Sequence, residues 1–151
     1  MLSLPRAKSQ EPRAKSQAYA DFQIGQSATF TSRITEDMMK KFQDISGDNN
    51  PLHIDEAFAL EKGFKARVVY GMLAAALYSC LTGVYIPGRN CLLHSVHTDF
   101  INPVFVGDEL TVKGVVVEKH DSVHQLVIKA EIRNQDGQKV SRAKIEAGVL
   151  D

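Results

Sequence analysis

The chain has 151 residues, a length that suits one domain with one hydrophobic core. Apolar residues make up 44% and charged residues 24%, as in ordinary globular proteins, and the formal net charge at pH 7 is zero. This balance gives no electrostatic reason to expect a nucleic-acid or membrane-surface partner. The longest apolar-rich stretch, residues 68–86, is interrupted by glycines and polar residues, so no membrane span is expected.

The first 17 residues differ from the rest of the chain. The sequence Pro-Arg-Ala-Lys-Ser-Gln occurs at residues 5–10 and again at residues 12–17. Two copies with prolines and almost no apolar residues cannot form a coiled coil, so we expect a flexible basic arm over residues 1–21. The folded domain is then expected to span residues 22–151.

Two features bear on the compartment. The basic arm weakly resembles an organellar transit sequence. The two cysteines, Cys80 and Cys91, match no metal or redox spacing, and reduced thiols are the favoured interpretation. We therefore expect a cytoplasmic protein, with the mitochondrial matrix as the alternative.

Hydrophobic periodicity predicts a strand over residues 26–34, followed by a helix. Thr35 is placed to cap this helix, and Gly47 is placed to end it. A second short helix is expected over residues 55–62 and a longer one over residues 71–85. The apolar stripe of the first helix consists of Met38, Met39, Phe42 and Ile45.

The longer helix is apolar nearly all round, which predicts that it is buried. From residue 90 the hydrophobic period changes to two, which is typical of strands separated by turns. The expected strands span residues 91–101, 109–119, 122–133 and 139–150. This order predicts an α+β fold in which an antiparallel sheet wraps a long buried helix. Exposed sheet edges favour pairing with a second copy of the chain.

Residues 46–53 read Ser-Gly-Asp-Asn-Asn-Pro-Leu-His and place a carboxylate and an imidazole five positions apart. The glycine and asparagines favour a turn, and the proline disfavours helical geometry at Asn50. A bend here lets Asp48 and His53 share one water molecule, which suits addition of water to an activated double bond. On these residues alone, a plain turn with Asp48 as a cap and His53 as a core histidine remains a competing interpretation.

Three segments of this chain resemble the R-specific enoyl-CoA hydratases, or MaoC-like dehydratases, of the hot-dog fold. They are Gly47-Asp48-Asn49-Asn50-Pro51-Leu52-His53, residues 69–73 (Val-Tyr-Gly-Met-Leu) and residues 102–110, and the likeness extends over about residues 22–150. The resemblance implies interconversion of a trans-2-enoyl thioester and an (R)-3-hydroxyacyl thioester. The thioester would be carried by coenzyme A or an acyl carrier, and neither a metal nor a separate cofactor is implied.

The resemblance also implies roles for individual residues. Asp48 and His53 are the candidate catalytic pair, and the backbone N–H of Gly71 is the candidate donor to the thioester oxygen. Asn50 and Tyr70 complete the candidate substrate-binding residues, although Asn50 suits bracing of the bend better than contact with substrate. The family usually has histidine where this chain has Tyr70, a difference expected to affect pocket size and substrate choice more than the reaction.

Other interpretations stay open. A thioesterase of the same fold, or a non-catalytic acyl-thioester-binding or assembly subunit, would also suit the resemblance. His94 and His97 point to opposite faces of a strand and cannot readily chelate one metal ion. Lys62, Lys65 and Arg67 could meet coenzyme phosphates or an acidic carrier, and a solvated loop explains them equally well.

As partners we expect the small-molecule acyl thioester, an acyl carrier protein, and further copies of the chain in a homodimer or higher homo-oligomer. Neither nucleic acid nor a membrane is expected.

Overall fold

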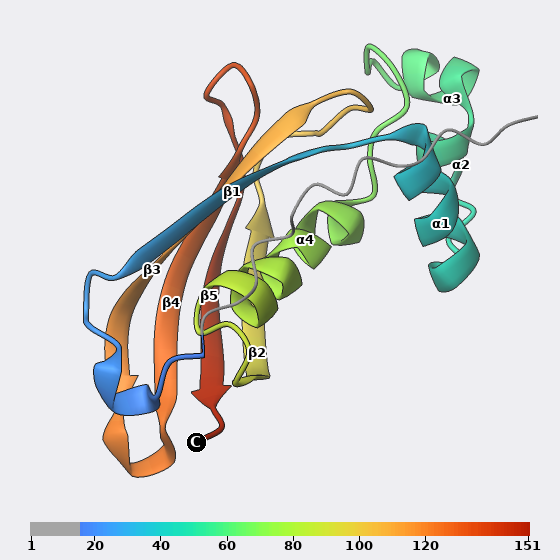
Figure 1. Ribbon diagram of the computed structural model, residues 1–151. Helices are drawn as coiled ribbons and strands as arrows, with labels where there is room; N and C mark the ends of the chain where they lie inside the picture. The colour runs from blue at the N-terminus through green and yellow to red at the C-terminus, as the bar shows by residue number, and fades with distance from the viewer. Residues whose placement is uncertain (1–15) are drawn as a thin grey trace, which may run out of the picture.

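Five antiparallel strands form one curved sheet in the order β1-β3-β4-β5-β2, and the helix α4 lies along its inner face (Figure 1). This computed structural model describes residues 16–151, so the basic arm predicted before residue 16 lies outside the described residues. The strands are β1 (Ser27–Arg33), β2 (Cys91–Phe100), β3 (Glu109–His120), β4 (Gln125–Arg133) and β5 (Lys139–Val149). The α-helices are α1 (Glu36–Ser46), α2 (Pro51–Ile54), α3 (Glu56–Glu61) and α4 (Gly71–Cys80).

The ends of α1 follow from its sequence. The Thr35 hydroxyl accepts a hydrogen bond from the N–H of Met38 at 3.2 Å, which satisfies one of the free donors of the first turn. Gly47 ends the helix in the left-handed region, at φ 71°. Met39 is buried as predicted, but Ile45 is 84% exposed, so its expected place in the apolar stripe was wrong.

The bend after α1 contains a helical turn that the sequence analysis did not predict. Pro51 disfavours helix before it, but its fixed φ suits the first position of a new helix, and α2 begins there. The Asn50 side chain caps this turn by accepting from the N–H of Leu52 at 3.0 Å. The imidazole of His53 therefore stands on a helix and not in an irregular loop.

The predicted helix over residues 71–85 has two parts. It is α-helical to Cys80 and continues as a π-helical segment, Leu81–Tyr85. Tyr78 is fully buried against the sheet, as the prediction of a buried helix requires, whereas Met72 on the same helix is 62% exposed. The sheet covers only one side of α4 in a single chain. None of the helices in residues 16–151 is long and apolar enough to cross a bilayer.

The hydrophobic core lies between α4 with its π-helical continuation and the inner face of the sheet. Gly114 on β3 lets the two layers approach, because a Cβ added there would lie 2.7 Å from a methyl group of Leu81. Ile128 on β4 packs at the same point. This close approach fixes the position of α4 on the sheet.

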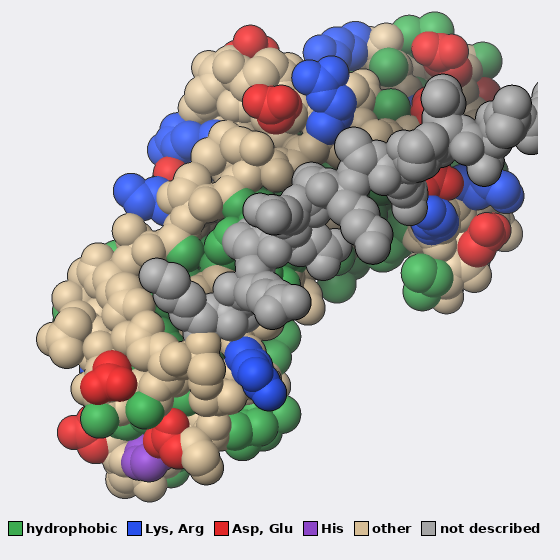
Figure 2. All heavy atoms as spheres, in the orientation of Figure 1, with side chains coloured by type: hydrophobic (Ala, Val, Ile, Leu, Met, Phe, Trp, Pro, Cys, Tyr) green, Lys and Arg blue, Asp and Glu red, His purple; other side chains and the backbone are tan. Residues whose placement is uncertain are grey.

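The two edge strands of the sheet differ in their exposure. Side chains on β1 alternate between exposed and half-buried, whereas nearly every residue of β2 is exposed on both faces. Hydrophobic side chains also reach the surface around α1 and α3 (Figure 2). The exposed apolar residues on and just after β2 are Leu92, Leu93, Val96, Phe100 and Ile101.

Packing onto the folded domain begins before Phe22. Tyr19–Asp21 forms a 3-10 helix, and Tyr19 is buried. Its hydroxyl donates to the Asp121 carboxylate at 2.8 Å, and its N–H donates to the Asp151 carboxylate at 3.0 Å. The boundary expected between residues 21 and 22 therefore moves toward the N-terminus.

Candidate active site

His53 faces a cavity of about 340 Å³ at the N-terminal end of α4. The helix α4 contributes Gly71 and Ala74 to its wall. Residues 68–70, 100–104 and 140–141 form the rest of the lining. Most of these side chains are apolar, so a ligand that enters the cavity meets few polar groups besides the imidazole.

The orientation of the imidazole is fixed by a backbone carbonyl. His53 Nδ1 lies 2.7 Å from the carbonyl oxygen of Val68. A carbonyl only accepts, so Nδ1 carries the proton and Nε2 of the neutral ring is left as an acceptor. The segment that supplies this carbonyl is itself held, because the N–H of Val68 donates to Leu52 and a β-bridge joins Val68 to Phe105.

Asp48 lies in a different environment. Its carboxylate is exposed and is not part of the cavity wall. Oδ1 accepts from the N–H of Asn50 at 3.0 Å, and the N–H of Asp48 donates to the Ser46 hydroxyl at 3.1 Å. The carboxylate thus caps a local turn, and Asn50 braces the bend, as its position in the sequence suggested.

Tyr70 connects the two members of the candidate pair. Its side chain is only 2% exposed, and its hydroxyl donates to the carbonyl oxygen of Asp48 at 2.9 Å. Its ring centroid lies 4.2 Å from that of His53, and the ring of Phe42 packs against it at 4.9 Å. Burial raises the pKa of Tyr70, the Asp48 charge raises it further, and Arg67 opposes the shift.

Gly71 is the first residue of α4, and its N–H makes no hydrogen bond among the described residues. It lines the cavity, so the positive end of the helix dipole, with its free donors, lies beside the site. A glycine at this position permits close approach of a ligand to the backbone. The structure adds a second reason, because a Cβ would lie 3.2 Å from the ring of Phe100.

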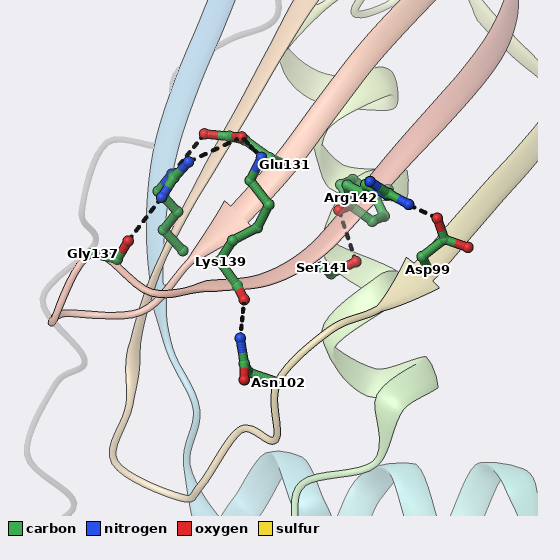
Figure 3. A network of polar contacts seen from close by, with 9 residues as sticks. Asp99, Asn102, Glu131, Gly137, Lys139, Ser141 and Arg142 are labelled. Atoms are coloured by element: carbon green, nitrogen blue, oxygen red, sulfur yellow. Dashed lines mark hydrogen bonds and ion pairs between the residues drawn. The ribbon is translucent and has the colours of Figure 1, made fainter.

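The wall opposite α4 is anchored to the neighbouring strand. Asn102 donates through its side chain to the carbonyl oxygen of Lys139 at 2.8 Å, and the Lys139 ammonium pairs with Glu131 at 2.8 Å (Figure 3). Hydrogen bonds from Arg133 and Lys139 hold the pKa of Glu131 down at about 2. On the same face Arg142 pairs with Asp99 at 2.8 Å.

The sequence analysis missed two parts of this site. Asn102 was named only as the first residue of the segment 102–110 that resembles the family. The carbonyl of Val68 left no signal in the sequence, because any residue supplies a carbonyl. A side-chain pattern could not have revealed either contact.

All three basic residues named before α4 have partners among the described residues, and the Lys62 ammonium lies 3.3 Å from the Glu61 carboxylate. Arg67 pairs with Glu36 and donates to the carbonyl of His53 at 3.4 Å. The Lys65 ammonium lies over the ring of Phe105, 4.5 Å from its centroid. No group of three side chains suited to bind a metal ion gathers within residues 16–151.

Comparison with known proteins identifies the class. The model of the MaoC like domain family matches residues 20–138. The (R)-specific enoyl-CoA hydratase of Aeromonas caviae is 35% identical over 115 residues, which cover 76% of this chain and 86% of the relative. The solved structure of the A. caviae (R)-hydratase superposes with a TM-score of 0.82 at 31% identity, covering 86% of this chain and 98% of that one.

An R-hydratase from Pseudomonas aeruginosa gives the same TM-score, 0.82, at 34% identity, covering 89% of this chain and 86% of that one. The sheet wrapped on a central helix is therefore the hot-dog fold. The chain belongs to the MaoC-like dehydratase family.

Proposed function

We propose that this protein is an (R)-specific enoyl-CoA hydratase. It adds water across C2 and C3 of a trans-2-enoyl thioester to give an (R)-3-hydroxyacyl thioester, and it catalyses the reverse dehydration. Membership of the family and the activity named for the A. caviae relative support this reaction. The observation that carries it is the Nδ1 contact with Val68, which makes Nδ1 the donor and so assigns the acceptor of the neutral imidazole to Nε2.

In this proposal one water molecule lies between Asp48 and His53. The water donates one hydrogen bond to the Asp48 carboxylate and the other to Nε2 of His53. Its oxygen attacks C3 while the imidazole, the member that faces the cavity, takes a proton. A proton then reaches C2 from the same pair. One water supplies both the hydroxyl and the hydrogen, so the reaction needs no oxidant, reductant or separate cofactor.

The charge that develops on the thioester oxygen needs a donor. Gly71 lines the cavity as the first residue of a ten-residue helix, and its N–H makes no hydrogen bond among the described residues. Loss of one such donor typically costs about 3 kcal/mol in the barrier. We propose that this N–H receives the oxygen, as the family resemblance implied.

A panel of enoyl thioesters tests the proposal. Enoyl-CoA and enoyl-carrier substrates of graded chain length are incubated with the full chain, and loss of the conjugated double bond and release of free thiol are both measured. Loss of the double bond without thiol release supports a hydratase. Thiol release would identify a thioesterase of the same fold, and binding without turnover would identify a non-catalytic subunit. The ratio of rates between the two carriers selects coenzyme A or a carrier protein.

We further propose that a second copy covers the β2 edge. This strand is exposed along both faces and carries a row of apolar side chains that a lone chain leaves in water. Phe100 and Ile101 belong both to this row and to the cavity wall, so pairing at β2 would complete the site.

Val96→Lys should shift the oligomer toward monomer in sedimentation and lower the hydration rate. A Val96→Lys chain that keeps its oligomeric state would contradict pairing at this edge.

We propose the cytoplasm as the working compartment, with the mitochondrial matrix as the alternative. Both cysteines are free, which suits a reducing environment. Location of the tagged full chain by cell fractionation decides between the two.

A further inference from the structure

Tyr70 holds the acidic half of the site in place. We infer that it is a positioning residue, one that fixes the Asp48 loop against His53 and not one that donates to the substrate. This inference rests on the proposed hydratase function. It also concerns a position where the chain departs from the histidine usual in the family.

The Tyr70 hydroxyl has a single proton with which to donate. It donates this hydrogen bond to the Asp48 carbonyl oxygen at 2.9 Å, because a carbonyl can only accept. Burial keeps the phenol protonated by raising its pKa, so it remains a donor. The hydroxyl therefore has no proton left for the thioester oxygen, which the Gly71 N–H is placed to receive.

The bend is held by two kinds of hydrogen bond. Apart from the Tyr70 contact, the side-chain hydrogen bonds of residues 46–50 are exposed and local, such as those from the Asn50 N–H to the Asp48 carboxylate and from the Gln43 side chain to the Asn49 side chain. Water competes with exposed hydrogen bonds of this kind. The Tyr70 contact is half-buried and spans 22 residues, so it ties the bend to the start of α4.

The aromatic ring of Tyr70 contacts a residue on each of its two sides. Tyr70 packs on His53 on one side and on Phe42 of α1 on the other. The same side chain thus contacts the imidazole with its ring and the Asp48 backbone with its hydroxyl. Any displacement of Tyr70 moves the two members of the pair relative to one another, and displacement by about 1 Å can lower a rate about 100-fold.

The test is Tyr70→Phe, which keeps the ring and removes the hydroxyl. We expect kcat for crotonyl-CoA hydration to fall about tenfold with KM unchanged, since the loop and not the substrate loses a contact. A substrate-binding hydroxyl would instead raise KM and leave kcat unchanged, and that result overturns the inference. The matched control is Tyr85→Phe. The Tyr85 ring also stacks on a phenylalanine, Phe30 at 4.7 Å, but its hydroxyl makes no hydrogen bond among the described residues. This control should keep full activity.

A double variant asks whether Tyr70 acts through Asp48. If it does, Tyr70→Phe should cost nothing further in a chain that already carries Asp48→Asn. Full additivity of the two losses contradicts action through Asp48.

A third measurement is independent of activity. Amide hydrogen exchange of residues 48–50 and of Leu52 should accelerate in Tyr70→Phe and not in Tyr85→Phe. Unchanged exchange overturns the inference even if hydration is observed. A wild-type chain that fails to hydrate any enoyl thioester, with exchange accelerated in the variant, contradicts the proposed function and leaves the contact standing.

Discussion

His53 and Asp48 lie five positions apart in the chain, yet different kinds of contact hold them. The imidazole stands on a helical turn, faces the cavity and is fixed through Nδ1 by the carbonyl of Val68. The carboxylate lies on an exposed turn, and its deepest anchor is the bond from Tyr70 to its backbone. The basic half of the site is therefore preorganised within one chain, whereas the acidic half depends on a loop and on one tyrosine.

The largest effects should come from the pair itself. Asp48→Asn and His53→Ala should each lower the hydration rate of crotonyl-CoA roughly 100- to 10,000-fold, because each removes a proton acceptor for the attacking water. Steady-state kinetics at high enzyme concentration measures the residual rate. Full activity in either variant contradicts the pair.

The same two variants should differ in stability, which sharpens the comparison. Asn keeps an acceptor oxygen for the N–H of residue 50, so Asp48→Asn should leave the thermal midpoint nearly unchanged. His53→Ala loses a half-buried hydrogen bond and the packing on Tyr70, so its unfolding free energy should fall by about 1 kcal/mol or more. Equal midpoints in calorimetry would show that the imidazole is no better anchored than the carboxylate.

Gly71→Ala should come next in size. Its Cβ would stand 3.2 Å from the Phe100 ring, and overpacking of this kind costs about 1–3 kcal/mol. We expect kcat/KM to fall about tenfold or more as α4 and the ring move apart. Adding Phe100→Leu should restore part of the loss, and a double variant no better than Gly71→Ala would exclude the clash as the cause.

Arg67 should matter less, although it contacts the His53 backbone. Its bond to that carbonyl is long at 3.4 Å, and its ion pair with Glu36 is largely exposed on the acidic side. Such pairs contribute at most about 1 kcal/mol, so Arg67→Met should lower kcat no more than about fivefold. A loss as large as that of His53→Ala would mean that Arg67 meets the substrate.

The smallest effect on activity is expected from Glu131, on the outer face of the sheet. Its folded-state pKa of about 2 lies below its ordinary value of 4.5, so its interactions with Arg133 and Lys139 stabilise the fold above pH 4.5. That contribution is lost as the pH falls from about 4.5 to about 2. Glu131→Gln should flatten the stability profile in this acidic window and leave hydration at neutral pH unchanged. An unaltered acid profile contradicts the shift.

The sequence predicted the fold well where periodicity decides it. The strand patterns after residue 90, the Thr35 cap and the Gly47 stop all correspond to observed elements. The incorrect predictions concern residues whose exposure depends on whether another segment packs against them. Met72 and Ile45 look like core residues in their helical patterns, but the sheet covers only one side of α4, and no segment of residues 16–151 covers Ile45 at the end of α1.

The candidate site likewise contains residues that could be predicted from the sequence and contacts that could not. His53 could be proposed because its chemistry depends on residue type, and Gly71 because it lies in one of the three segments that resemble the family. The Val68 carbonyl, the Asn102 anchor and the Tyr70 bond to Asp48 could not, because they join backbone groups to residues 15, 37 and 22 positions away. The distance of the Asp48 carboxylate from the cavity wall likewise depends on turn geometry that the motif alone does not determine.

The stereochemistry of the product tests the central claim most directly. Crotonyl-CoA is incubated with the full chain, the hydroxyacyl thioester is hydrolysed, and the two enantiomers of the 3-hydroxy acid are separated by chiral chromatography. We expect the (R) enantiomer alone, with Asp48→Asn giving only a trace of the same product. The (S) enantiomer, or a racemic mixture at wild-type rate, would contradict the assignment.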